Sequence, residues 1–257
     1  MACVPLSCAE AIIFPHGTGE LIAEKTAIQP GHSFYVDLHF VLEKGWHIYW
    51  INPGDSGQPP RVSWQLPAGV SAGSIAWPFP KRLTAFSAVD FGYEDEVSLL
   101  VPMKASPMLQ AGTAVNLAGD VKLVICSDVC VPGKTHVSLS LSVKNQETLL
   151  DGASRTIFMA ARQALPRRPP AQWNFTVANR KDYFRLTGAV GRSIKKAFFF
   201  PRQPNQVENT APQTVRSTDA GFTMTLKESD QLLKPIHRLQ GILLVENQAY
   251  SIDAPVK

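Results

Sequence analysis

The sequence predicts an all-β protein with two β-sandwich domains that are joined by a helix and a proline-rich hinge. The 257 residues exceed the length of most single domains, so two domains are expected. Twenty prolines and 17 glycines break the chain often, which favours many short strands over long helices. Short apolar runs separated by turn residues are typical of antiparallel sandwiches.

The composition and charge indicate a globular protein and argue against three other classes. Hydrophobic residues make up 45% of the chain and charged residues 18%, which argues against disorder. No apolar run approaches the roughly 18 residues that a membrane-spanning helix needs. The net charge of +4 is too small to indicate a nucleic-acid-binding protein.

The first half of the chain carries the strongest strand pattern. Residues 20–42 have a strand-like pattern in which apolar and polar residues alternate from Phe34 to Phe40, and a strand follows at residues 46–50. In that second strand His47 and Tyr49 share one face, opposite the tryptophans. Residues 67–73 are expected to form a turn and residues 79–93 an irregular excursion. Further strands are expected at residues 61–66, 74–77, 97–103, 114–117, 122–125 and 135–143.

A helix is predicted at residues 147–165, where apolar residues recur three and four apart. Prolines at 166, 169 and 170 end it and form a stiff hinge. The second half contains no cysteine. Its expected strands are residues 173–177, 183–188, 195–200, 221–226, 241–246 and 248–253.

The N-terminus has the pattern of the end of a secretory signal. Ala9-Glu10-Ala11 fits the A-x-A pattern that precedes signal cleavage, and a lipid attached at Cys8 is the weaker alternative. An exported protein would reach a compartment in which disulfides persist. We therefore divide the chain into a signal-peptide remnant (1–11), a first sandwich (12–145), a connecting helix and hinge (146–170) and a second sandwich (171–257).

The strongest chemical feature is the C-x3-C pair of Cys126 and Cys130, which lies between strand-like segments. An extended chain would hold the two Cα atoms about 13 Å apart, whereas a disulfide needs about 5.5–6 Å. The segment must therefore turn, and Ser127 and Asp128 are suitable turn residues. A disulfide that closes so short a loop constrains the unfolded chain little, which suits a bridge that opens and closes.

The spacing of the cysteines leaves other interpretations open. The pair could form a permanent local disulfide or two buried thiols. A metal site would need further ligands, and His47, His136 and Met103 form no recognised set with the cysteines. Copper would be the most plausible ion at such a site.

Several motifs in one order resemble the N-terminal periplasmic region of the DsbD family of thiol:disulfide interchange proteins. The resemblance is closest to the branch that contains suppressor of copper sensitivity protein B. It covers residues 20–145 well and the second half more loosely. The motifs are Gly45-Trp46-His47-Ile48-Tyr49-Trp50, Asn52-Pro53-Gly54-Asp55-Ser56-Gly57, Trp77-Pro78, Asp90-Phe91-Gly92-Tyr93-Glu94 and the cysteine pair followed by Val131-Pro132-Gly133-Lys134-Thr135.

The resemblance implies two immunoglobulin-like sandwiches and a redox-active disulfide between Cys126 and Cys130, without a cofactor or a bound metal. It implies a periplasmic protein-disulfide reductase that receives electrons from a thioredoxin-like domain of the same full-length protein. Periplasmic thioredoxin-fold proteins would be its substrates, and a segment absent here would anchor it to the membrane. Other members space their cysteines more widely, which puts the loop geometry and the list of partners in question.

The resemblance also assigns roles around the cysteines. Asp90, Phe91, Gly92 and Tyr93 match a cap loop that shields the disulfide; the alternative is that the two aromatics fill the core. Cys130 matches the cysteine that partners reach.

His47 and Tyr49 are expected to border the site and to tune thiolate formation, or else to form a polar outer face. Two other functions stay open at this point: a non-catalytic binding module and a copper-binding protein of copper tolerance.

Overall fold

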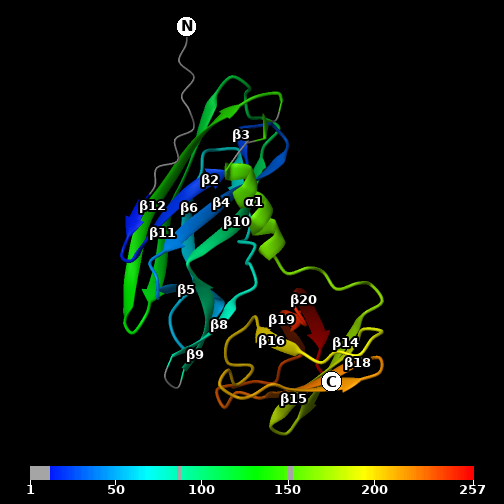
Figure 1. The fold of residues 1–257 in the computed structure, drawn as a ribbon. Helices are drawn as coiled ribbons and strands as arrows, with labels where there is room; N and C mark the ends of the chain where they lie inside the picture. Colours follow the sequence, from blue (N-terminus) through cyan, green and yellow to red (C-terminus); the bar gives the residue numbers. More distant parts are fainter. Residues whose placement is uncertain (1–11, 86–87, 147, 150–152) are drawn as a thin grey trace. The chain divides into compact units, whose positions relative to one another are not determined.

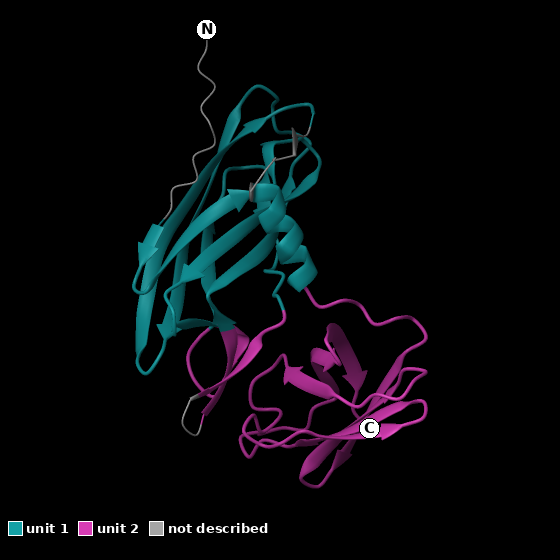
Figure 2. Ribbon diagram, viewed as in Figure 1, with its two compact units in different colours: residues 1–48, 59–78, 93–164 teal, residues 49–58, 79–92, 165–257 magenta. Residues whose placement is uncertain are grey.

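The computed structural model describes residues 12–85, 88–146, 148–149 and 153–257, which fall into two compact units. The predicted signal-peptide remnant at residues 1–11 lies outside the described residues. Unit 1 comprises residues up to 48, 59–78 and 93–164; unit 2 comprises residues 49–58, 79–92 and 165–257 (Figure 2). The described chain is nearly all β, which confirms the predicted class. Its one described helix is too short and too polar to cross a membrane.

The first sheet of unit 1 has five strands in the order β1-β2-β4-β10-β7 (Figure 1). Its pairs are antiparallel, and the apolar residues that alternate along β4 are buried, as the two-residue periodicity predicts, but Asp37 and His39 between them are buried as well. The buried set includes Phe34, Val36, Leu38 and Phe40. The strands are β1 (Ile12–Phe14), β2 (Gly17–Ala23), β4 (Ser33–Leu42), β10 (Glu96–Ala105) and β7 (Val70–Ala72).

The second sheet has the order β13-β3-β12-β11-β5-β9-β8, and β6 pairs with β11. Its central feature is the long antiparallel hairpin of β11 and β12, in which β11 ends at one cysteine and β12 begins at the other. The strands are β13 (Thr148–Leu149), β3 (Lys25–Ile28), β12 (Cys130–Val143), β11 (Ala114–Cys126), β5 (His47–Gly54), β9 (Ala88–Glu94), β8 (Lys81–Ala85) and β6 (Arg61–Gln65).

Helix α1 (Ala153–Ala164) lies within the predicted helical range. Phe158 and Ala161 are buried, and the guanidinium of Arg162 lies 5.4 Å from the ring centre of Tyr35 on β4. The predicted start of the helix at residue 147 is wrong, because Thr148 and Leu149 pair with β3 as strand β13.

Unit 2 contains two further sheets, in the orders β14-β15-β18-β17 and β16-β19-β20. Their shared apolar core includes Phe184, Phe199, Phe222 and Leu243, all fully buried. The strands are β14 (Asn174–Arg180), β15 (Tyr183–Ala189), β18 (Gly221–Lys227), β17 (Thr214–Thr218), β16 (Ala197–Pro201), β19 (Arg238–Val245) and β20 (Gln248–Pro255).

Two segments from the first half of the chain belong to unit 2. The ring centres of Trp50 and Phe91 lie 6.5 and 5.3 Å from that of Phe200. The side-chain amide of Asn52, which is fully buried, donates a hydrogen bond to the carbonyl of Pro201 at 2.7 Å. The sequence-based division assigns both segments to the first sandwich, residues 12–145. The domain boundaries drawn from the sequence stay a prediction.

Three local predictions are wrong. Residues 79–93 are not irregular, because β8 and most of β9 pair there as a hairpin, with residues 86–87 outside the described residues. Both faces of β9 are buried, so its sequence lacks the alternation that marks a half-exposed strand. Residues 70–72 form β7 instead of a turn. Within residues 74–77, only an isolated bridge at Ala76 replaces the expected strand.

Candidate functional site

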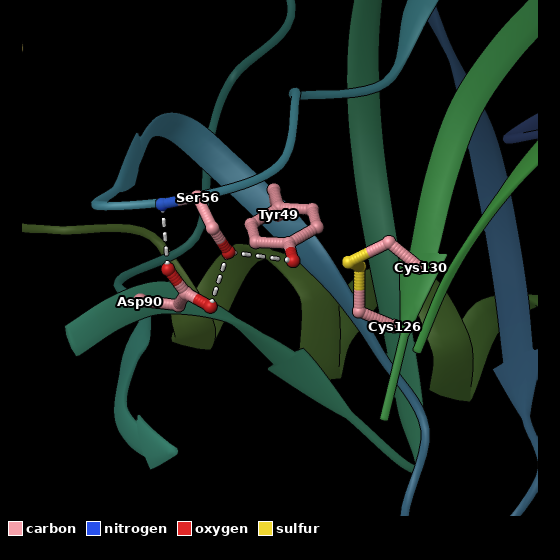
Figure 3. Close-up of a disulfide and its surroundings, with 5 residues drawn as sticks. All are labelled: Tyr49, Ser56, Asp90, Cys126 and Cys130. Carbon is pink, nitrogen blue, oxygen red and sulfur yellow. Dashed lines mark hydrogen bonds between the residues drawn. A yellow bond between two sulfur atoms is a disulfide. The ribbon is translucent and has the colours of Figure 1, made fainter. Parts of the chain in front are cut away.

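Cys126 and Cys130 form a disulfide at the end of the β11–β12 hairpin (Figure 3). They are direct partners in the strand register, with their Cα atoms 4.1 Å apart. The backbone N–H of Ser127 donates to the carbonyl of Val129 at 3.0 Å, which closes the connection. The turn that the C-x3-C spacing requires is therefore confirmed.

The two cysteines differ in exposure. Cys126 is 1% exposed, because it ends a strand whose neighbours β5 and β12 flank it on both sides. Cys130 is exposed, and so is Val129 before it, at 62%. Cys130 therefore faces solvent, whereas Cys126 is covered by its neighbours.

His47 is the residue of β5 that pairs with Cys126. Paired residues of antiparallel strands point to the same face of a sheet, so the imidazole and the cysteine side chain share one face. The His47 side chain is buried. The structure thus brings together three of the predicted residues, Cys126, Cys130 and His47, within unit 1.

In unit 2, Tyr49, Ser56 and Asp90 form a hydrogen-bonded network (Figure 3). Asp90 accepts the backbone N–H of Ser56 at 2.9 Å and its hydroxyl at 2.8 Å. The Tyr49 hydroxyl lies 3.3 Å from the Ser56 oxygen. Burial raises the pKa of Tyr49, and the Asp90 carboxylate adds to the rise. Tyr49 is therefore a neutral hydroxyl at physiological pH.

Close contacts hold the same loop against the Tyr49 ring of β5 and the backbone of β9. A Cβ atom on Gly57 would lie 2.0 Å from the Tyr49 ring, and one on Gly54 would lie 2.3 Å from the Val89 carbonyl oxygen. Both glycines also have positive φ, so only glycine fits these positions. Asp55 accepts the backbone N–H of Val89 at 2.7 Å.

Sequence reasoning named Tyr49 and Asp90 but assigned no role to Asn52, Asp55 or Ser56. The signal was present, because all three lie in the Asn52–Gly57 motif that carries part of the resemblance. Their partners on β9 and β16 lie far away in sequence, so the motif alone could not identify them.

The four predicted cap residues lie on β9. Phe91 packs edge-on against Trp50, with ring centres 6.4 Å apart, and is 1% exposed. The Tyr93 hydroxyl, which lies in unit 1, donates to the carbonyl of Pro78 at 2.9 Å, and burial raises the Tyr93 pKa well above its usual value. Such contacts are typical of core aromatics, and the shielding role of these residues stays a prediction.

The candidate metal ligands are dispersed over different environments. His136 is exposed on β12 and bonded to Asp120 at 3.1 Å, whereas Met103 is 1% exposed on β10. Across the described ranges, no three His, Cys, Asp or Glu side chains converge in a way that could hold a metal ion.

An exposed cysteine bonded to a buried one, at the tip of a hairpin on an all-β scaffold, is the arrangement of a thiol:disulfide interchange domain. Residues 18–142 match the family model described as "Thiol:disulfide interchange protein DsbD, N-terminal". This part of the chain, which includes both cysteines, belongs to that family. No curated protein sequence matches the chain.

The fold is similar to a crystal structure of the N-terminal periplasmic domain of ScsB from Proteus mirabilis. The TM-score is 0.71 at 17% sequence identity, and the match covers 96% of this chain and 97% of the other. The likeness therefore extends through both units, well beyond the residues that the family model matches.

Proposed function

We propose that this chain is a periplasmic protein-disulfide reductase domain of the ScsB branch, built on immunoglobulin-like sandwiches. It takes electrons from a thioredoxin-like donor and passes them to thioredoxin-fold proteins through Cys126 and Cys130. The observation that carries the proposal is the unequal exposure of the two bonded cysteines. Family membership and the fold shared with the ScsB domain support it.

The reductive half-reaction follows from this asymmetry. In the reduced form, the Cys130 thiolate attacks a disulfide sulfur of the substrate, and one substrate sulfur leaves as a thiolate that takes up a proton. The resulting mixed disulfide joins Cys130 to the substrate. Cys126 then loses its proton and attacks the Cys130 sulfur, which releases the second substrate thiol. Two electrons and two protons have then passed to the substrate, and the Cys126–Cys130 disulfide has formed.

The donor runs the same steps in reverse. A donor thiolate attacks Cys130, Cys126 leaves as a thiolate, and a second donor thiol resolves the mixed disulfide. Both half-reactions need only Cys130 to meet the partner. The buried position of Cys126 protects the resolving sulfur from competing thiols.

Reduction of the bridge is expected to leave the β-fold intact. The closed loop is so short that its loss costs about 2 kcal/mol at most. A thiol count should rise by two after treatment with a reduced thioredoxin-like protein, while circular dichroism stays unchanged and the melting temperature falls by a few degrees. Unfolding on reduction, or no gain of thiols, would contradict the proposed function.

We further propose that the β9 segment shields the disulfide until a partner docks. Phe91→Ala is then expected to speed alkylation of the reduced cysteines by iodoacetamide several-fold, because the segment loses its anchor against Trp50 and Phe200. Tyr93→Phe removes only the bond to Pro78 and serves as the matched control. If Phe91→Ala alkylates at the wild-type rate while its melting temperature falls, the aromatic only fills the core.

A further inference from the structure

A row of three cations crosses the sheet near the disulfide. Lys122 on β11 pairs directly with Arg61 on β6 on one side and with Lys134 on β12 on the other. Because paired residues share a face, the three side chains lie next to one another. All three are exposed. We call Arg61, Lys122 and Lys134 the cation row.

The cation row lies on the same face of the hairpin as the disulfide. Side chains alternate along a strand, so Lys122, Val124 and Cys126 share one face of β11, and Lys134 and Cys130 share that face of β12. Lys122 lies four positions before Cys126, which corresponds to about 13 Å along the strand. The pair between them, Val124 and Pro132, is apolar.

Like charges placed directly opposite one another destabilise a sheet, so the row needs a reason other than folding. In the part of the chain that the structure describes, no carboxylate lies within 4 Å of these three cationic groups. Asp120, two pairs further from the cysteines, is bonded to His136 instead. Its pKa is lowered by that bond and by the charges of Lys134 and Lys122.

We propose that the cation row is a docking site for acidic side chains of the protein that exchanges its disulfide with Cys130. This inference rests on the proposed function and names the charge of the partner. A partner whose sulfur bonds Cys130 would cover Val129 and the neighbouring part of the hairpin face that carries Cys130 and the cation row. Residues of the partner that lie about 13 Å from the partner's reactive sulfur would then contact the cation row. Carboxylates at those positions would relieve the repulsion among the three cations. Asp128 is exposed at the tip of the hairpin, so the disulfide lies between this carboxylate and the cation row.

The test uses two model thiols in 10 mM buffer, where charges act over about 30 Å. One is a peptide with a single cysteine followed by three glycines and four glutamates, and the other replaces the glutamates with lysines. Opening of the Cys126–Cys130 disulfide is measured with each peptide and with neutral dithiothreitol. The variants are K122E/K134E and K122Q/K134Q, with folding checked by circular dichroism.

The glutamate peptide is expected to react about tenfold more slowly with K122E/K134E than with the wild type, and the lysine peptide is expected to react faster. The rates with K122Q/K134Q should lie between those with the wild type and with K122E/K134E. Dithiothreitol should open all three disulfides at similar rates, and 0.5 M salt should remove the differences. Comparing one peptide across variants cancels the effect of its own charges on its thiol. If both peptides respond equally to the substitutions, the docking role is wrong. A wild-type disulfide that dithiothreitol does not open would instead overturn the proposed function.

Discussion

Cys126→Ser is expected to accumulate stable mixed disulfides through Cys130, visible as higher bands on non-reducing gels of a periplasmic extract. The exposed sulfur can still attack a partner, but the resolving sulfur is gone, so the intermediate persists. Cys130→Ser should accumulate few such species, because the remaining thiol at position 126 is buried at 1% exposure.

The double variant Cys126→Ser/Cys130→Ser, which keeps Cys3 and Cys8, is the matched control, and only bands that it lacks are assigned to the Cys126–Cys130 pair. Nearly all of the trapped mixed disulfide is therefore expected in Cys126→Ser and almost none in Cys130→Ser. If Cys130→Ser traps partners better than Cys126→Ser, the roles of the two sulfurs are exchanged. Equal trapping would show that the difference in exposure does not control access.

Asp37→Asn is expected to stabilise the protein at pH 8 by about 1–3 kcal/mol. Asp37 lies on β4 with 0% exposure, and His39 is 3.7 Å from its carboxylate. Burial raises the Asp37 pKa from 3.8 to about 7, and the carboxylates of Glu20 and Glu96 add to the rise. Ionising this group in the folded protein is therefore costly.

The sign of the pH dependence follows from this shift. Between pH 4 and 7 the folded state holds a proton on Asp37 that the unfolded state has released, so the free energy of unfolding falls as pH rises through this window. Urea unfolding of wild type and Asp37→Asn between pH 4 and 8 should show a gap that widens with pH. Asp120→Asn is the control, because the lowered pKa of Asp120 confines its titration to the acid end of the range, so its gap to the wild type should stay nearly constant above about pH 5. A gap that is constant with pH would mean that Asp37 is ionised throughout.

The features that sequence predicted best depend on local pattern. The alternation in β4 predicted its buried face, and the proline cluster after residue 165 predicted the end of α1. The C-x3-C spacing required the turn that Ser127 closes. Each of these depends on residues that lie within a few positions of one another.

The features that sequence missed depend on distant partners. Strand β9 looks irregular because Asp90, a polar residue, is buried between Val89 and Phe91, and its bonds to Ser56 explain that burial. The bond of Asn52 to Pro201 joins residues 149 positions apart. No periodicity or spacing encodes such a contact. The cation row was missed for the same reason, because Arg61 meets Lys122 only through strand register.

The two early segments that belong to unit 2 affect the order in which the chain can fold during synthesis. Trp50 and Phe91 leave the ribosome long before Phe200, the ring against which both pack. A nascent chain folds its N-terminal part first, so these two aromatics are exposed to solvent until some 110 to 150 further residues have been translated. The cysteines at 126 and 130 emerge within this interval. The nascent protein therefore exposes these two aromatics in the same period as two free thiols, which is when a chaperone would matter most.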